Sequence, residues 1–223
     1  YGLYLFDITF PNNYPLKPPA VKFCTNDGRV RMNPNLYVDG KVCLSILGTW
    51  QGPSWTAACT LRSVMLSIQS LLNNNPIQNE PGHENDKGKT AQDYNRCLAY
   101  ENVKVAVHRM LTTPPKGFEC LKSAMNYSFL RNYDEYVKIL EGFKKDSGKK
   151  MKGGFFSFES HFEPTSLLNK IADEKARILD NKKLRDEIIE LHETIKPHYK
   201  DVEEKCKILT RETQFQINVL RKR

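Results

Sequence analysis

The chain has 223 residues with a formal net charge of +8, and 39% of its residues are hydrophobic. This length predicts a folded protein with one good core and an appendage, or two small domains. No apolar run approaches the roughly 18 residues of a membrane span, and the positive charge is spread out rather than gathered into a stripe. Neither a membrane nor a nucleic acid is therefore expected as a partner.

Six cysteines are scattered along the chain, and no two of them form a CxxC pair. This arrangement argues against a zinc site and against a disulfide framework, and it is typical of a reducing compartment. The dense basic cluster at 144–152 contains serine and glycine, which indicates a solvated linker, with a nuclear import signal as the alternative interpretation. We therefore expect a cytoplasmic protein without a bound metal, and a nuclear location stays open.

The start of the chain predicts short strands joined by turns. Residues 4–10 alternate large apolar side chains with others, which is the period of a strand, and Pro11 ends the pattern. Three prolines at 15–19 exclude a helix or a central strand, and residues 20–24 resume a short strand. An antiparallel meander is the natural assembly of such strands. Residues 28–42 carry turn signals without a period, which indicates an irregular segment.

Helical spacing of apolar side chains begins farther along the chain. It predicts a helix over 61–72, with Thr60 as its N-cap. After a polar stretch at 73–89, the spacing predicts a second helix around 103–110 and a third over 121–140.

The composition changes again towards the end of the chain. Residues 165–223 lack glycine and are rich in Lys, Glu and Leu. Four apolar residues there follow a 4-3-4 spacing: Leu184, Ile188, Leu191 and Ile195. We expect one or two amphipathic helices, and both coiled-coil pairing and packing against the core remain open. The chain therefore divides into a core at 1–143, a linker at 144–164 and a helical extension at 165–223.

One short segment carries a chemical signal. Asn35 lies eight residues before Cys43, and Pro34 and Gly40 can turn the backbone of this segment. A thiol can hold an acyl group as a thioester, and a nearby amide NH2 can donate to the oxyanion that forms when the thioester is attacked. This pair therefore predicts an acyl carrier.

Several motifs follow one another in a specific order. They are Tyr14-Pro15-x-x-Pro18-Pro19, Asn33-Pro34-Asn35, Gly40-x-Val42-Cys43-Leu44, Trp55 and Asn75-Pro76. In this order and at these spacings, residues 1–111 resemble the ubiquitin-conjugating enzymes. The motifs Leu44-Ser45-Ile46-Leu47-Gly48-Thr49-Trp50 and Asn79-Glu80-Pro81-Gly82 are similar to the large subgroup of that family.

The resemblance implies an α+β ubiquitin-conjugating fold, which is an antiparallel β-meander with helices packed on one side. Here it would be followed by the C-terminal helical extension. In that fold a first helix and a first strand precede the position of Tyr1, so we expect both to be missing from the core at 1–143.

The resemblance also assigns residue roles. Cys43 corresponds to the thioester nucleophile and Asn35 to the asparagine that stabilises the oxyanion. Asn33, Pro34 and Gly40 correspond to residues that support the loop, and Asn33 stands where the family usually has histidine.

Further positions match less fully. Leu16, Ala57 and Ala58 correspond to the loops where ligases and the activating enzyme dock. The acid that helps the incoming lysine lose its proton has no secure counterpart, although Asp86 and Asp93 lie near the right segment.

The implied activity is acceptance of ubiquitin, or of a ubiquitin-like modifier, from an activating enzyme and transfer to a lysine or a ligase. Some motifs are most like a subtype that the non-conventional activating enzyme charges. No cofactor is expected on this chain, because ATP is used by the activating enzyme. Two alternatives remain: a non-catalytic variant that only presents ubiquitin, and a Cys-His peptidase that uses Cys43 with His83 or His108.

Overall fold

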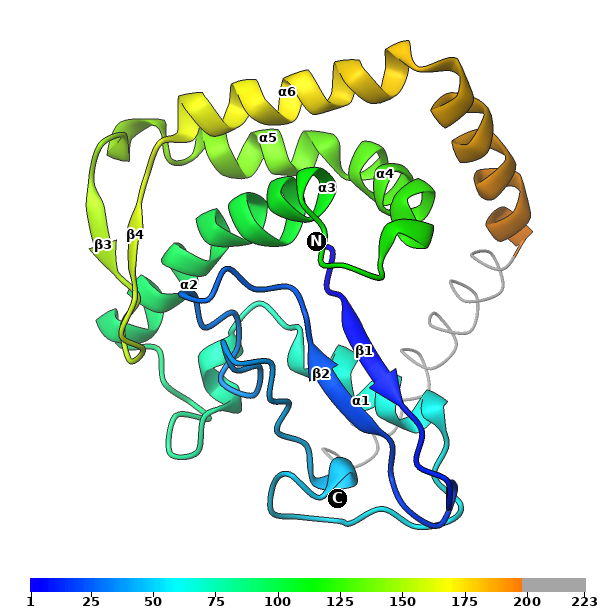
Figure 1. Ribbon diagram of the computed structural model, residues 1–223. Coiled ribbons are helices and arrows are strands. Elements are labelled where there is room, and N and C mark those ends of the chain that lie inside the picture. Colours follow the sequence, from blue (N-terminus) through cyan, green and yellow to red (C-terminus); the bar gives the residue numbers. More distant parts are fainter. Residues whose placement is uncertain (198–223) are drawn as a thin grey trace, which may run out of the picture.

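The structure is a computed structural model that describes residues 1–197. Its longer elements run in the order shown in Figure 1. They are β1 (Phe6–Thr9), β2 (Ala20–Phe23), α1 (Leu61–Leu71), α2 (Lys89–Glu101), α3 (Met110–Thr112), α4 (Lys122–Arg131), α5 (Tyr133–Glu141), β3 (Lys150–Lys152), β4 (Glu159–His161) and α6 (Pro164–Asp180). Short 3-10 turns are η1 (Ser45–Leu47), η2 (Pro76–Asn79), η4 (Glu119–Leu121) and η5 (Lys144–Asp146), and η3 (Asn102–Arg109) is a π-type segment.

The strands near the start of the chain form the expected antiparallel meander in a reduced form. β1 pairs with β2, and Phe6 lies opposite Phe23. Single antiparallel bridges, Lys22 to Lys41 and Leu36 to Val42, continue the pairing. The α+β class and the meander are thus confirmed, and the third strand is reduced to bridges because the chain between β2 and Cys43 turns repeatedly.

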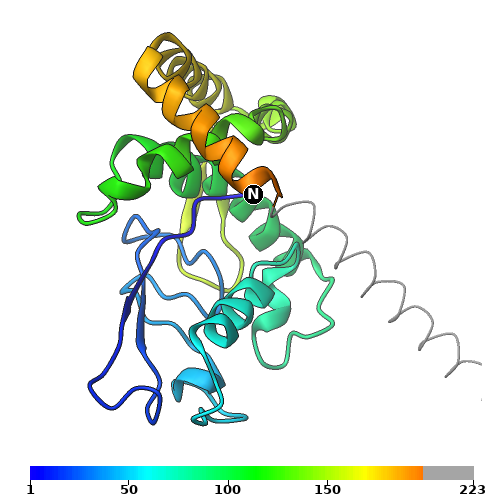
Figure 2. The same cartoon turned by 90° about the vertical axis from the view of Figure 1, so that its right-hand side faces the viewer.

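The helix α1 confirms the prediction from Thr60 and the apolar spacing. The Thr60 hydroxyl accepts a hydrogen bond from the Ser63 N–H, and the Ser63 hydroxyl accepts one from the Thr60 N–H. This capping box satisfies two N–H groups that a helix start leaves open. Val64 and Ile68 are buried, and Figure 2 shows the β1–β2 strands on one side of this part of the molecule with α1 on the other.

Two helices differ from the prediction. The second begins at Lys89 rather than near 103, and it continues through η3 and α3 to Thr112. Its first turns carry many polar residues, so the apolar period was weak, yet Tyr94 is fully buried and its hydroxyl donates to the Arg31 carbonyl. The third is divided into α4 and α5 at Asn132, whose side chain donates to the Ser128 carbonyl and whose backbone leaves the helical region.

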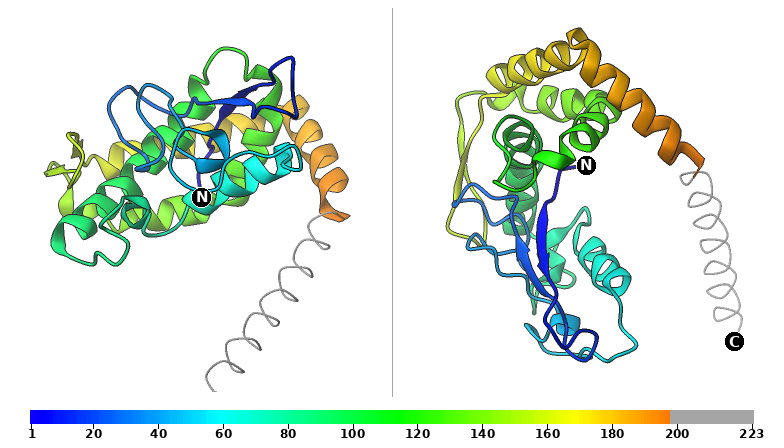
Figure 3. Two further views of the ribbon diagram at one scale, coloured as in Figure 1. Left: turned by 90° about the horizontal axis from the view of Figure 1, so that it is seen from below. Right: turned by 45° about the vertical axis from the view of Figure 1, so that its right-hand side comes forward.

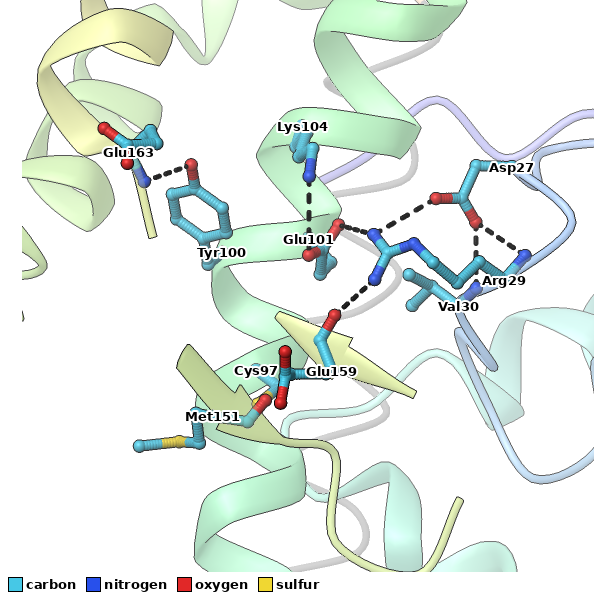
Figure 4. Close-up of polar contacts among 10 residues, drawn as sticks. All are labelled: Asp27, Arg29, Val30, Cys97, Tyr100, Glu101, Lys104, Met151, Glu159 and Glu163. Atoms are coloured by element: carbon cyan, nitrogen blue, oxygen red, sulfur yellow. Dashed lines mark hydrogen bonds and ion pairs between the residues drawn. The ribbon is translucent and has the colours of Figure 1, made fainter. Parts of the chain in front are cut away.

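The expectation of a solvated linker at 144–164 is wrong. This segment contains the β3–β4 hairpin, which lies against α2. Its lysines point outward, but Phe158 and Phe162 are buried in the core. A Cβ on Gly153 would lie 2.3 Å from the Phe158 ring, so the absence of a side chain there lets the hairpin close over the ring. Figure 4 shows that Arg29 connects this hairpin to α2, because its guanidinium contacts both the Glu159 carbonyl and the Glu101 side chain.

The described part of the helical extension packs against the rest of the chain. α6 lies along α5, and Leu167 and Ile171 join the same core as α1 and α2. After a break at Asn181, a helical segment at 182–197 turns down beside α4 (Figure 3). Packing on the core is therefore the arrangement that residues up to 197 adopt.

Two hydrogen bonds fix the helical segment at 182–197 to α4. Ser123 donates to Glu187, and Tyr127 shares a hydrogen bond with His192. The part of the predicted extension that includes Val202, Cys206 and Leu209 lies outside the described residues. Over residues 1–197 we find no helix with the length and apolarity that a membrane crossing needs.

Candidate active site

Two hydrogen bonds place Asn35 directly beside Cys43. The Cys43 N–H donates to the Asn35 carbonyl at 2.9 Å, and the Asn35 side-chain NH2 donates to the Cys43 carbonyl at 2.9 Å. The other side-chain atom of Asn35, Oδ1, is buried and has no hydrogen-bond partner. The carboxamide is therefore directed at the cysteine that sequence analysis selected. The bond to the Cys43 carbonyl uses one of the two N–H groups of this NH2, so a second donor is available for an oxyanion.

Cys43 is a buried residue. The residue exposes 2% of its area, and the segment that follows η1 folds back beside it. The Thr49 hydroxyl donates to the Val42 carbonyl at 2.6 Å and accepts from the Leu44 N–H at 3.0 Å. Thr49 thus bridges the backbone of the residues on both sides of Cys43.

The loop residues expected from the resemblance lie around this pair. Asn33 is buried; its side chain donates to the Leu71 carbonyl at 2.8 Å and accepts from the Asn35 N–H at 2.9 Å. Pro34 is buried next to it. These contacts tie the end of α1 to the backbone of Asn35, as a loop-supporting residue must. A cavity of about 240 Å³ opens beside Asn33 on the side of Tyr1.

Gly40 turns the backbone between Asn35 and Cys43. Its φ is +96°, in the left-handed region that favours glycine. Its carbonyl accepts from the Phe23 N–H at 2.8 Å, and an added Cβ would lie 2.9 Å from the Lys22 side chain. The turn therefore connects the Cys43 segment to β2 in a geometry that a larger residue would disturb.

The expected docking residues lie in two loops that meet. Leu16 exposes 73% of its area, and Ala57 and Ala58 are exposed as well. The Trp55 indole N–H donates to the Pro15 carbonyl at 2.7 Å, which holds the two loops together. The structure therefore brings all three residues to one exposed end of the molecule, and their docking role stays a prediction.

The residues of the peptidase alternative are engaged elsewhere. His83 shares a hydrogen bond of 3.0 Å with Asp86 and packs against the Phe155 ring. The Asp86 carboxylate accepts from the Gly88 N–H and from His83, and these bonds hold its pKa below the ordinary value. His108 lies on η3 in a half-buried place near Lys170. Neither histidine contacts Cys43, so the peptidase reading is not favoured.

The lysine-activating acid is not identified by these contacts. Asp86 is bound to His83, and Asp93 forms an ion pair with Lys89 at 3.4 Å on the first turn of α2. Over residues 1–197, no group of three or more His, Cys, Asp and Glu side chains could hold a metal ion.

Sequence reasoning missed two residues that contact this loop. Thr49 was seen only as part of a loop motif, and no signal predicts which carbonyls its hydroxyl meets. Arg31 donates to the carbonyls of Asn33 and Pro34. Its signal was a lone cation between the buried residues Val30 and Met32, which is weak because exposed cations commonly alternate with buried residues.

Comparison with known proteins finds a matching family model and similar proteins. Residues 1–96 match the family model described as ubiquitin-conjugating enzyme. The chain is 42% identical over 172 residues to ubiquitin-conjugating enzyme E2 Z of Xenopus tropicalis, covering 76% of this chain and 55% of that protein. It is 40% identical over 181 residues to the Homo sapiens protein of the same name, covering 80% and 51%. A probable ubiquitin-conjugating enzyme protein 17 of Caenorhabditis elegans is 37% identical over 180 residues, covering 74% and 25%.

Residues 1–96 therefore form a domain of the ubiquitin-conjugating enzyme family. Within that family the chain is similar to ubiquitin-conjugating enzyme E2 Z, in agreement with its Gly52-Pro53-x-Trp55 and Tyr94-Asn95-x-Cys97 motifs. The similarity extends past the family model, because 172 matched residues exceed the 96 of the conjugating domain. The chain spans about half the length of these E2 Z relatives.

Proposed function

We propose that this chain accepts ubiquitin, or a related modifier, as a thioester on Cys43 and passes it to a lysine amine or a ligase cysteine. The observation that carries the proposal is the contact between the Asn35 carboxamide and the Cys43 peptide at 2.9 Å, inside the segment that matches the family. A donor at this position reaches the place where negative charge develops when the thioester carbonyl is attacked.

The reaction has two acyl transfers. The Cys43 thiolate attacks the thioester carbonyl on the activating enzyme, a new C–S bond forms, and the enzyme's thiolate leaves. An amine then attacks the Cys43 thioester, a C–N bond forms, the C–S bond breaks, and the ammonium proton passes to a base. Asn35 stabilises the oxyanion of the tetrahedral intermediate in the second step through a side-chain N–H.

The partners follow from this chemistry. A ubiquitin-activating enzyme supplies the modifier and uses the ATP, and the exposed end with Leu16, Ala57 and Ala58 is the proposed docking surface for that enzyme and for ligases. The similarity to E2 Z supports the non-conventional activating enzyme as the supplier. We propose a cytoplasmic location, with nuclear entry as the alternative, and no cofactor on this chain.

A charging assay tests the proposal. Full-length protein is incubated with ATP, ubiquitin and either the conventional or the non-conventional activating enzyme. The products are separated with and without a reducing thiol. We expect an adduct that the thiol removes. The Cys43→Ser variant should give an adduct that resists the thiol, because an oxygen ester replaces the thioester. Cys120→Ser, at an exposed cysteine, should behave like the unchanged protein.

Other outcomes discriminate between the classes. If neither activating enzyme yields an adduct, the proposed function is wrong. An adduct that never passes its cargo to an amine or a ligase would favour a presenting module. Cleavage of a peptide without ATP would favour the peptidase.

A further inference from the structure

An arginine side chain lies between two aromatic rings beside the active-site loop. The Arg31 guanidinium lies 3.3 Å from the centroid of the Tyr37 ring and 5.0 Å from that of Phe156. Tyr37 belongs to the turn between Asn35 and Cys43. Phe156 belongs to the connection of the β3–β4 hairpin, which lies beyond the segment that matches the family model. The Arg31 side chain thus connects the β3–β4 hairpin to the loop that contains Asn35 and Cys43.

The same guanidinium holds the backbone on the N-terminal side of Asn35. Its Nε donates to the Asn33 carbonyl at 3.2 Å, and its Nη2 donates to the Pro34 carbonyl. The Pro34 carbonyl belongs to the peptide group that contains the Asn35 nitrogen. Because the Asn33 side chain accepts from that nitrogen, the peptide before Asn35 is fixed from both sides. Arg31 therefore acts on the group that orients the Asn35 carboxamide.

Phe156 is itself held in place by the core. Its ring centroid lies 5.1 Å from that of Tyr94, which is fully buried on α2. The Tyr94 hydroxyl also donates to the Arg31 carbonyl at 2.9 Å, so one side chain contacts both Phe156 and Arg31. Phe158, next along the hairpin, is buried and anchors the strand that follows. The Phe156 ring is thus partly buried and packs against the core through Tyr94.

We propose that Arg31 and Phe156 are positioning residues, through which the β3–β4 hairpin sets the geometry of Asn35 and thereby the rate of thioester discharge. This inference rests on the proposed function of Cys43. The face of an aromatic ring attracts a guanidinium, and a displaced catalytic donor loses much of its effect on rate. Loss of the Phe156 ring therefore lets Arg31 and the peptide before Asn35 move without removing any catalytic group.

Kinetics of discharge test the inference. The charged full-length protein is mixed with free lysine, and loss of the thioester is followed over time. We expect Phe156→Leu, which keeps apolar bulk but removes the ring face, to slow discharge by about tenfold. Phe156→Tyr keeps the face and should stay within about twofold of the unchanged protein. Phe155→Leu is the matched control, because this neighbouring ring contacts His83 and not Arg31.

A double-mutant cycle separates positioning from general damage. If Phe156 acts through Asn35, then Phe156→Leu should have little further effect in an Asn35→Ala background, because the group that it positions is absent. An equal loss in both backgrounds, or no loss in either, overturns the inference. Thermal unfolding of each variant shows that the compared proteins are folded.

An NMR measurement decides the inference even if the chain cannot be charged. Phe156→Leu should shift the side-chain amide resonances of Asn35, whereas Phe155→Leu should leave them in place. Unchanged Asn35 resonances in Phe156→Leu would overturn the positioning role. Absence of charging in the unchanged protein would instead refute the proposed function, so the two failures are distinguishable.

Discussion

The Glu101 carboxylate, which has no exposed side-chain surface, lies 3.2 Å from the Arg29 guanidinium. Lys104 lies 3.7 Å from the other carboxylate oxygen, and Asp27 lies 3.3 Å from Arg29. Arg29 also donates to the Glu159 carbonyl on β4, as Figure 4 shows. A buried charge on α2 is thus balanced mainly by a side chain that also holds the hairpin.

Removal of Arg29 should destabilise the fold strongly. In Arg29→Ala the Glu101 charge keeps only the longer contact to Lys104, and we expect a loss of about 3 kcal/mol in the free energy of unfolding. Adding Glu101→Gln should restore part of this loss, because the buried charge is then absent. Urea denaturation measures both, with Arg62→Ala at an exposed arginine as the control. A small effect in Arg29→Ala would contradict the assigned role.

Asn33 should tolerate histidine better than alanine. Alanine leaves the part-buried Asn35 N–H without its acceptor, at a cost of about 1–3 kcal/mol. An imidazole can both donate and accept, and the cavity of about 240 Å³ beside Asn33 can hold the larger ring, so Asn33→His should cost less. Denaturant unfolding compares the two, and Asn12→Ala at an exposed asparagine is the control. Equal losses would show that the side-chain hydrogen bonds do not matter.

Thr49 should limit access to the Cys43 sulfur. Thr49→Val keeps the shape of the side chain but removes the hydrogen bonds to the Val42 carbonyl and the Leu44 N–H. Each such bond contributes about 1 kcal/mol, so opening of the loop becomes easier and alkylation of Cys43 should be about fivefold faster or more. Mass spectrometry of the peptide that contains Cys43 measures the rate. An unchanged rate would mean that other contacts cover the thiol.

The half-buried His108 should make the fold less stable as the pH falls. Burial and the nearby Lys170 lower its pKa below the ordinary value, with Glu174 acting in the opposite direction. Below about pH 6.5 the unfolded histidine binds a proton that the folded one still rejects, so acidification favours unfolding until the folded pKa is reached. In His108→Gln this decline between pH 7 and 5 should be smaller. Identical pH profiles of the melting temperature would contradict this account.

The sequence predicted those features that depend on residues close together in the chain. Thr60 and the apolar spacing after it predicted α1, and the motif around Asn35 and Cys43 brought together two residues that the structure places in contact. The catalytic and docking roles of those residues remain predictions, because contacts alone do not test them. Gly40 was identified as a turn, and its positive φ explains why that position holds glycine.

Other features depend on contacts between distant parts of the chain. Each strand of the hairpin has three residues with one inward side chain, Met151 or Ser160, so the alternation is too short to recognise among lysines. The first turns of α2 carry many polar residues, so the apolar spacing alone did not reveal where this helix begins. The contact between Arg31 and Phe156 joins residues far apart in sequence, so no local pattern predicts it.

The contacts of Tyr100 with Phe162 and Glu163, just before α6, limit how this chain can be shortened. The Tyr100 ring packs against Phe162 at 5.1 Å between centroids, and its hydroxyl accepts from the Glu163 N–H at 2.8 Å. A deletion after residue 143 would strip both partners from a ring that lies inside the conjugating core. The segment from the β3–β4 hairpin to α6 is thus an integral part of one cooperative folding unit rather than a removable tail. A fragment that ends at residue 143 would expose the apolar surface that this segment covers.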